Sequence, residues 1–545
     1  MTKTDLPPLA ALCRDFALRL TERPSETGTP DEASFGPWLA TLLRDSKCFG
    51  PAPEVWTFPV APGDPRHCVA MLVRGSGTKT VLLTGHYDTV TTRDYGDLRH
   101  LATRPEALAI ALAAQVAQAP EGTTEALVRA DLAAGYLPGR GLLDMKAGLA
   151  AGLAAIAGFA AAPQDGNLLF LAVPDEENAS AGARAAARDL PAQLASRGIN
   201  LCFAINLDAI ADDGDGTDGR VIATGTVGKV LPTAFVVGVP VHSGFPLRGV
   251  NAAVLAGSIA ARLEWAPELT DHSATTPGTP ISLLSLKDGK TGYDVTTPGT
   301  AFATFSVLNH RRNPAEVLAQ VRPVVAEAVA ATLASLRRRA AQPDGRSPLL
   351  ADCPILSYAE LLAHTRSSQP GIDADLHAEA LRLRDQGHTL PDTCEALTAL
   401  VWQRSGLSGP AVILGLGSIP YLATELDDAK AMQAVHALVQ TARDRHDTSL
   451  RVVDYFAGIS DVSFLGQGDV GAFSALAANT PGWDSLVQLG PDSLLQVPTV
   501  NLGPWGRDYH RPYERLETGY AFRVLPDLLL RLSTSVLANS PRTAT

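Results

Sequence analysis

The chain has 545 residues, of which 46% are hydrophobic and 19% are charged, and its formal net charge is -12 at pH 7. This length exceeds one ordinary hydrophobic core, and the composition excludes an intrinsically disordered chain. The negative charge and the lack of a basic run exclude a protein that binds nucleic acid through its phosphates.

The cysteines and the apolar segments bear on the compartment. Six cysteines without a CxxC pair predict reduced thiols rather than a disulfide framework. The N-terminus lacks a signal-peptide pattern. The chain also has no uninterrupted run of about 18 apolar residues, the length that a membrane-spanning helix needs. The Ala-rich segment 149–162 is too short for one and predicts a buried helix. We therefore expect a cytoplasmic protein without a membrane partner.

The first part of the chain predicts an α/β domain. Two helices, at 9–21 and 32–44, precede any strand. Apolar β-rich runs then alternate with helical stretches, among them a long helix at 146–161. This alternation favours a sheet whose strand ends can hold a functional site. The predicted strands lie at 55–59, 68–73, 80–84, 167–173 and 201–206.

From about residue 225 the pattern changes to strand, helix, strand, strand, helix, which favours a small inserted domain with helices on one face. After a polar break at 341–348, strands at 411–416 and 450–455 are expected to return the chain to the first domain. The inserted strands are predicted at 230–239, 281–286 and 301–308, and its helices at 250–265 and 314–339. Residues 357–407 predict helices and loops without an evident purpose.

Residues of the types that bind metals follow the predicted strands. His86 and Asp88 come directly after the third strand, Glu176 and Glu177 after the fourth, and Asp208 after the fifth. Asp144 lies in a Gly-rich turn before the long helix, and His510 lies near the C-terminus.

Each of these motifs alone occurs more often in a solvated loop than in a metal site. Together they predict a cation, because three apolar strands bring carboxylates to one edge and buried unpaired carboxylates are costly. Two histidines and several carboxylates suit zinc, with manganese or cobalt as alternatives.

In this order the motifs resemble those of the M20 metallopeptidases. The resemblance begins at Pro24-Ser25-Glu26-Thr27-Gly28 and runs to His510, so it covers most of the chain. The length and the runs Gly458-Ile459-Ser460-Asp461 and His510-Arg511-Pro512-Tyr513-Glu514 look most like the arginine-utilisation (RocB-like) subgroup. That likeness implies a link to arginine metabolism by association.

The resemblance implies a two-domain α/β fold. A Zn-peptidase-like catalytic domain would comprise residues 1–224 and 341–545, with a helical insertion near 357–407 in its second part. An inserted α+β, ferredoxin-like lid domain would comprise residues 225–340. In many members this lid also forms a homodimer.

The resemblance also implies a dinuclear centre with two divalent metal ions. Asp144 would bridge them, His86 and Asp208 would complete one site, and Glu177 and His510 would complete the other. Further implications are Glu176 as the general base, Asp88 as the acid that orients the His86 imidazole, and a cis bond between Asp144 and Met145.

In the lid, His242 of Val241-His242-Ser243-Gly244 matches the histidine that stabilises the tetrahedral intermediate, often from the partner subunit. Asn251 and Arg312 are candidates for substrate binding. Many members hold substrate with an Asn before a Pro in the lid, where this chain has Gly292-Tyr293-Asp294-Val295-Thr296-Thr297-Pro298. We therefore expect a different grip on the substrate.

We predict a hydrolase that uses a metal-bridging water to cleave an amide bond in a small peptide or N-acyl amino acid. The alternative is a non-catalytic protein that senses an amino acid or peptide on the same scaffold; loss of Glu176 or of a ligand would have favoured it. A nucleotide-binding enzyme is disfavoured, because Gly415-Leu416-Gly417 lacks the third glycine and the acid of a dinucleotide fingerprint.

Overall fold

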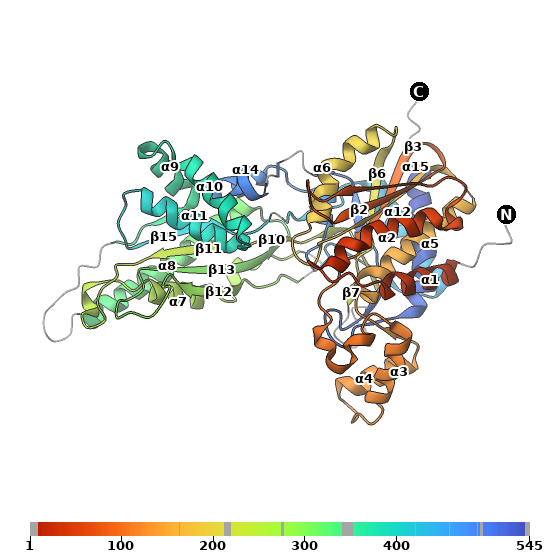
Figure 1. Cartoon of the computed structure of the whole chain (residues 1–545), viewed down its shortest axis with the longest axis horizontal. Coiled ribbons are helices and arrows are strands. Elements are labelled where there is room, and N and C mark those ends of the chain that lie inside the picture. The colour runs from red at the N-terminus through yellow and green to blue at the C-terminus, as the bar shows by residue number, and fades with distance from the viewer. Residues whose placement is uncertain are drawn as a thin grey trace. The chain divides into compact units, whose positions relative to one another are not determined.

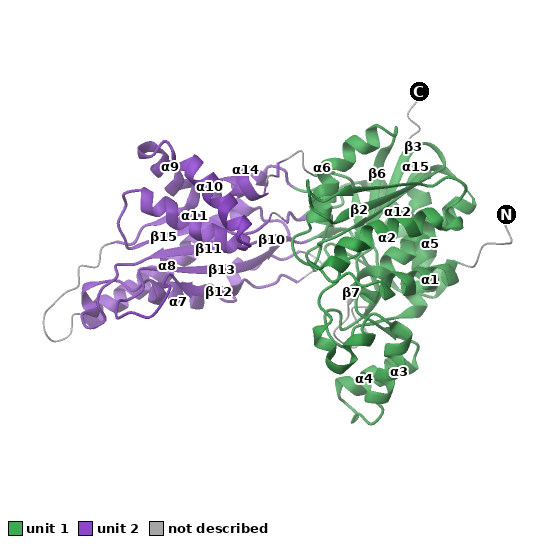
Figure 2. Ribbon diagram, in the orientation of Figure 1, with its two compact units in different colours: residues 1–226, 424–468, 492–545 green, residues 227–423, 469–491 purple. Residues whose placement is uncertain are grey.

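The computed structural model describes most of the chain (Figure 1). Two compact units, each with helices packed on a sheet, confirm the predicted two-domain α/β class (Figure 2). Unit 1 comprises residues 1–226, 424–468 and 492–545, and unit 2 comprises residues 227–423 and 469–491. The described residues are 9–162, 164–211, 220–273, 277–340, 352–419, 421–456, 458–487, 489–490 and 494–539.

Unit 1 is built on an eight-stranded sheet with a parallel centre. β3 (Ser76–His86) pairs in parallel with β5 (Asp165–Val173) on one side and with β6 (Asn200–Asn206) on the other. The carboxyl ends of these strands therefore meet at one edge of the sheet, where a site can form. Beyond β5 the sheet continues with β2 (His67–Arg74) and ends at β1 (Glu54–Pro59). Beyond β6 it continues with β18 (Thr499–Asn501) and β8 (Arg220–Ala223) and ends at β17 (Leu450–Val453).

Helices cover both faces of this sheet, and for that reason the central strands carry consecutive apolar residues in their buried parts, at 81–83 in β3 and 168–173 in β5. The helices of unit 1 are α1 (Leu9–Glu22), α2 (Pro30–Asp45), α3 (Pro105–Gln115), α4 (Thr124–Ala133), α5 (Ala147–Ala161), α6 (Ala181–Ala195), α12 (Ala429–His446), α13 (Val462–Leu465) and α15 (Leu525–Asn539). Along β5, Leu168 and Phe170 belong to the core formed with α1, α5 and α15. Leu169 and Leu171 belong to the smaller core formed with α6.

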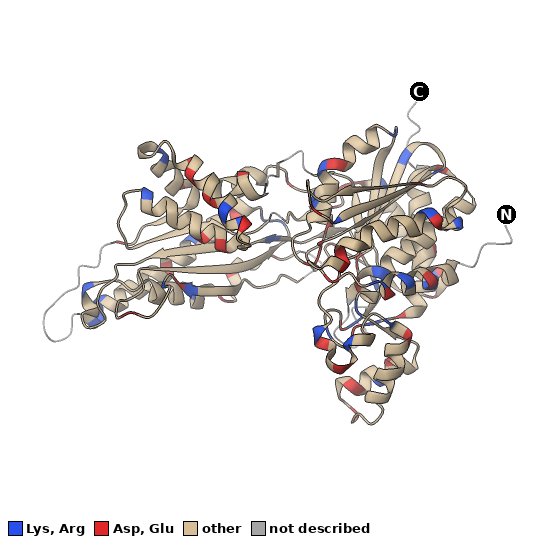
Figure 3. Ribbon diagram, viewed as in Figure 1, with Lys and Arg blue, Asp and Glu red and all other residues tan. Residues whose placement is uncertain are grey.

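A helical lobe lies between β3 and β4 (Leu137–Pro138). We define it as residues 93–133, which contain η2 (Arg93–Leu101), α3 and α4. It has a small core of its own around Tyr95 and Leu108. Charged residues of both signs lie on it (Figure 3). Next to it, β4 joins a four-stranded sheet with β20 (Arg515–Leu516), β19 (Trp505–Arg507) and β7 (Ile210–Ala211), while β9 (Gly225–Thr226) pairs with β16 (Thr424–Glu425).

In the part of the chain that the structure describes, two helical segments are long and apolar enough to cross a membrane by length and composition alone, Leu142–Ala161 and Pro314–Ala340. The most apolar window of the first is 94% buried inside the protein. This segment includes α5 and is therefore a core helix, as its sequence predicted. The corresponding window of the second is 39% buried.

Unit 2 is built on a six-stranded sheet with helices on both faces (Figure 1). The sheet runs β10 (Gly228–Val230), β13 (Thr300–Asn309), β11 (Pro232–Val237), β15 (Ala411–Leu416) and β14 (Ile355–Ser357), with β12 (Ser282–Asp288) also paired to β13. One helical layer contains α7 (Ala252–Leu263) and α8 (Pro314–Ala340), and the other contains α9 (Tyr358–Ser368), α10 (Ile372–Asp385), α11 (Leu390–Arg404) and α14 (Ala472–Asn479).

Unit 2 is larger than the inserted domain expected at 225–340, and its helices lie on two faces rather than one. We expected β15 to rejoin the first domain, but it pairs antiparallel with β11, where Phe235 lies opposite Ile413. The helices of the 357–407 region pack on this pair, with Leu361 and Leu397 in the shared core. By contrast, β17 pairs with β8 in unit 1, as expected.

Candidate metal centre

His86 is the last residue of β3 and is buried. Its Nε2 lies 3.1 Å from Oδ1 of Asp144 and 3.9 Å from Oδ1 of Asp208. The strand end passes close to the turn that holds Asp144, since a Cβ atom on Gly85 would lie 2.0 Å from Cε of Met145. Glycine at position 85 therefore allows the two segments to approach.

Asp144 lies in the turn before α5 and faces both histidines. Its Oδ1 faces His86, and its Oδ2 lies 3.0 Å from Nε2 of His510. Gly141 opens this turn in the left-handed conformation, with φ of 73°. The bond between Asp144 and Met145 is cis, which confirms the expectation from the family resemblance.

Glu176 and Glu177 lie in the turn after β5. The carboxylate of Asp88 accepts hydrogen bonds from the backbone N–H groups of Glu176 at 3.1 Å and Glu177 at 3.2 Å. Nδ1 of His86 lies 3.0 Å from the backbone carbonyl oxygen of Asp88 but 3.6 Å from its carboxylate. Asp88 therefore contacts the imidazole mainly through its backbone, and its side chain holds the turn that carries the two glutamates.

Asp208 and His510 complete the cluster from two separate segments. Asp208 follows β6, and its backbone carbonyl accepts a hydrogen bond from Nδ2 of Asn501 on the neighbouring strand β18. His510 lies in the turn between β19 and β20 with φ of 63°, and its Nε2 lies 3.2 Å from Oε1 of Glu177.

The structure thus brings five predicted ligands into two overlapping groups that share Asp144. Within each group, one potential ligand atom per residue lies within 4.8 Å of the others. This donor set of imidazole nitrogens and carboxylate oxygens fits two divalent cations with a common carboxylate. The groups are His86, Asp144 and Asp208, and Asp144, Glu177 and His510.

Burial governs the protonation of the acidic side chains in this cluster. It raises the pKa values of Glu176 and Asp208 well above their usual range and also raises the pKa of Glu177. Burial acts on Asp144 in the same direction, but hydrogen bonds from His510 and His86 outweigh it and lower the pKa of Asp144. The carboxylates are desolvated and close together, an arrangement that divalent cations stabilise.

His242 lies in unit 2, in the exposed loop after β11. The backbone N–H of Gly244 donates to Nδ1 of His242 at 3.0 Å. A neutral imidazole that accepts at Nδ1 carries its proton on Nε2. His242 therefore presents an N–H donor at Nε2.

The two candidate substrate residues take part in hydrogen bonds within unit 2. The Asn251 side chain caps α7 by accepting from the N–H of Ala253. The Arg312 guanidinium donates to the carbonyl oxygens of Leu269 at 2.9 Å and Thr270 at 3.2 Å. Both side chains therefore have local structural roles, and their contact with substrate stays a prediction.

Two buried acidic residues near the site, Asp461 and Asp175, were not singled out by their sequence. Asp461 is 2% exposed, lies within electrostatic reach of Glu176 and belongs to a run that we had noted only for its family likeness. Arg66 forms an ion pair with Asp175, next to the glutamates. An ordinary Arg or Asp in a loop carries no sequence signal for burial, so these contacts depended on the fold.

Comparison with known proteins shows similarity along nearly the whole chain. The model of peptidase family M20/M25/M40 matches residues 117–479. The uncharacterised protein YqjN of Bacillus subtilis (strain 168) is 30% identical over 534 residues, which are 96% of this chain and 95% of YqjN. Protein RocB of the same organism is 27% identical over 542 residues, which are 95% of this chain and 93% of RocB.

Solved structures share the fold. A tripeptidase from Staphylococcus aureus superposes with a TM-score of 0.54 at 16% sequence identity, covering 97% of this chain and 99% of its own. The di-peptidase Dug1p from Saccharomyces cerevisiae gives a TM-score of 0.53 at 13% identity and covers 98% of each chain. At these identities the likeness establishes architecture, and the chemistry must be argued from the site.

Proposed function

Because the chain belongs to peptidase family M20/M25/M40 and is a hydrolytic enzyme of the M20 type, we propose that it cleaves an amide bond in a small peptide or N-acyl amino acid. One observation carries the proposal: Asp144 presents its two carboxylate oxygens to two different histidines, at 3.1 Å and 3.0 Å. A carboxylate shared in this way suits a pair of metal ions.

The proposed ligands divide between two divalent ions. His86 and Asp208 would hold one ion, Glu177 and His510 would hold the other, and Asp144 would be shared. We propose zinc, with manganese or cobalt as alternatives, since imidazole and carboxylate ligands suit all three. When bound, such ions acidify water and polarise the carbonyl group of a substrate.

Glu176 is the proposed general base. Its carboxylate reaches within 3.9 Å of Nε2 of His86, so it borders the cluster without belonging to either ligand group. Burial raises its pKa well above the usual range, so this carboxylate is a stronger base than an exposed glutamate. Asp88 fixes the backbone of Glu176 and Glu177, so one carboxylate can bind metal while the other moves a proton.

His242 is the proposed donor to the developing oxyanion. The hydrogen bond from Gly244 leaves the imidazole proton on Nε2, as this role requires. A donor of this type contributes about 3 to 4 kcal/mol of transition-state stabilisation.

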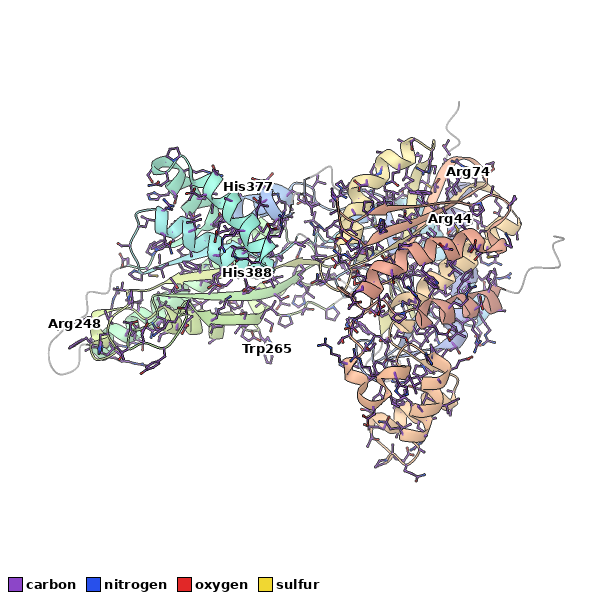
Figure 4. All side chains as sticks on the ribbon, in the orientation of Figure 1. Arg44, Arg74, Arg248, Trp265, His377 and His388 are labelled. Carbon is purple, nitrogen blue, oxygen red and sulfur yellow. The ribbon has the colours of Figure 1, made fainter. Side chains whose placement is uncertain are left out.

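We propose that the protein forms a dimer through unit 2. Among the described strands of its sheet, β12 pairs with β13 alone, so its other edge is free. Apolar side chains near this edge are exposed: Leu284 by 56% and Leu286 by 43%. Trp265, labelled in Figure 4, is exposed by 70%. An exposed strand edge with apolar side chains is a common surface for association.

The proposed substrate class includes arginine-containing or arginine-derived amides, because the RocB-like subgroup is associated with arginine utilisation. The 27% identity to protein RocB supports this assignment. All six cysteines are free, in keeping with a cytoplasmic location.

A turnover screen tests the proposal. Purified protein reconstituted with zinc, manganese or cobalt is incubated with dipeptides and N-acyl amino acids, arginine derivatives among them, and released amines are measured. We expect metal-dependent release that the Glu176→Gln variant lacks. Tight binding of these compounds without any turnover would favour the alternative, a non-catalytic sensing protein.

A further inference from the structure

The lobe at residues 93–133 contacts the two segments that carry Asp144 and His510. We propose that the lobe is a positioning element that sets the affinity of the ion held by Glu177 and His510. This inference rests on the proposed metal centre. Two chains of charged groups, each centred on a buried guanidinium group, and one apolar contact make the connection.

The first chain of charges holds the turn of His510. Asp131, on α4 of the lobe, accepts from Nε of Arg515 at 2.8 Å, and its Oδ2 lies 2.7 Å from Nη2. The same guanidinium, fully buried, donates through Nη1 to Asp508, two residues before His510. Asp508 and His510 both have positive φ, of 55° and 63°. Asp and His adopt positive φ more readily than most residues other than glycine, but two such residues in one turn are uncommon, and the contacts of Asp508 help to hold them.

The second chain of charges holds the turn of Asp144. Arg140 is 1% exposed and forms ion pairs with Asp94 of the lobe and with Glu514. Glu514 is fully buried, and its Oε1 accepts from the N–H of Gly141 at 2.9 Å. The backbone N–H of Arg140 also donates to the carbonyl of Ala102 in the lobe at 2.8 Å. Glu514 lies four residues after His510, so this chain joins both segments to the lobe.

An apolar contact supports the two chains of charges. Tyr513, three residues after His510, packs against the lobe core of Tyr95, Ala102, Leu108 and Leu112. Its hydroxyl also donates to Oε1 of Glu125 on α4 at 3.4 Å.

The contacts between the lobe and the turn of His510 act on one metal site, because His510 belongs to only one of the two ligand groups. His86 and Asp208 lie at the ends of β3 and β6 in the main sheet, and among the described residues no hydrogen bond or ion pair joins either to the lobe. His510 lies in a turn that is held by Arg515, and the same guanidinium also contacts Asp131 of the lobe. Buried ion pairs contribute little net stability, but they orient the groups that they join.

The test is a metal titration of full-length protein from which metal has been removed. Asp131→Asn keeps the size of the side chain and removes its charge. We expect one of the two ions to bind about 10- to 100-fold more weakly, as is usual when a residue that orients a ligand is lost, while the other keeps its wild-type affinity. Cobalt(II) absorption reports the coordination geometry during the same titration, independently of turnover.

Asp97→Asn is the matched control, because Asp97 is an exposed acid in the same lobe. It should leave both affinities unchanged. Asp94→Asn tests the second chain of charges and should weaken both ions, because this chain holds the turn of Asp144, which the two ions share. If Asp131→Asn does not fold, Glu125→Ala carries the test, because it removes the hydrogen bond between the lobe and Tyr513 in the segment of His510.

The outcomes separate this inference from the proposed function. Two ions bound normally by Asp131→Asn, or equal weakening of both ions by this variant, would overturn the positioning role of the lobe and leave the metal centre intact. A wild-type protein that binds no ion would overturn the proposed function and the positioning role with it.

Discussion

Asp144 joins the two halves of the candidate centre, because each of its carboxylate oxygens faces a different histidine. Glu176 differs from the five predicted ligands, since it borders the cluster but belongs to neither group of ligand atoms. The adjacent Glu177 belongs to one of them. A substitution of Glu176 can therefore test whether Glu177 binds metal while Glu176 transfers the proton.

Glu176→Gln should reduce turnover by at least about 100-fold while the protein still binds two ions, because the amide cannot accept the proton that a general base must take. Turnover and metal content are measured on the same preparation. Glu121→Gln, an exchange at an exposed position of the lobe, is the control. Near-normal turnover at equal metal content would remove Glu176 from the mechanism.

Metal affinity should rise with pH. Burial would lower the pKa of His510, but hydrogen bonds to Asp144 and Glu177 outweigh it and raise the value to about 10. The pKa of His86 is also raised, by Asp144 and Asp88 against the opposing effect of burial. Both rings are therefore protonated at neutral pH before they bind metal, and binding must release those protons.

Calorimetry in buffers of different ionisation enthalpy measures this release. At pH 7 we expect protons to leave as metal binds, and the affinity to increase as the pH is raised from 6 to 8. An affinity that is independent of pH over this range would contradict the assignment of these histidines as ligands.

At the scale of secondary-structure elements, the site forms where parallel strands end. β3, β5 and β6 each deliver their polar residues to the same edge, and the turns after them are tied together by side chains. Asp88, after β3, spans to the turn after β5 by accepting from two of its backbone N–H groups. This contact fixes the relative position of two elements.

Asp88→Asn should loosen the turn of Glu176 and Glu177, because one of the two acceptor oxygens becomes an amide N–H₂ group that cannot accept. We expect turnover to fall by about 10- to 100-fold and the affinity for one ion to fall with it. Thr27→Val is the matched control, since it removes only the hydroxyl that donates to Asp88 at 2.9 Å. An Asp88→Asn variant with wild-type turnover would show that the turn is held by other contacts.

At the scale of the whole molecule, the proposed catalytic residues are divided between two compact units. The predicted ligands and Glu176 lie in unit 1, whereas His242 lies in unit 2. Unit 2 also carries the free edge of β12, so the proposed dimer interface and the proposed oxyanion donor belong to the same unit.

Complementation tests whether His242 acts from a partner subunit. A mixture of equal parts of Glu176→Gln and His242→Ala protein should recover about a quarter of the wild-type activity, because half of the symmetric dimers are hybrids and each hybrid has one intact site. Activity is measured after subunit exchange has been verified. Leu286→Lys, at the exposed position on β12, should abolish both the dimer and the rescue.

No rescue despite subunit exchange would place the action of His242 within its own chain. Near-normal turnover of His242→Ala alone would remove the residue from catalysis and leave a loop histidine.

Local patterns predicted the central strands of unit 1 and most of the potential ligands, because the motifs of His86, Glu177 and Asp208 follow directly on apolar strands and that of Asp144 opens a helix. The short strands β8 and β18 were not predicted, and His510 follows no predicted strand. The sequence alone therefore predicted three parts of the candidate site: His86 after β3, the glutamate pair after β5 and Asp208 after β6. The family resemblance supplied the roles of these residues and the cis bond at Asp144.

Only the tertiary structure decided which distant segments meet. β15 has the apolar pattern of any buried strand, and no local signal states that its partner is β11 rather than a strand of unit 1. The links from Arg140 to Glu514 and from Asp131 to Arg515 span 374 and 384 residues. The sequence by itself determined the elements and the ligand types, because these depend on near neighbours; the division into units and the support of the site required the fold, because they depend on contacts between residues far apart in the chain.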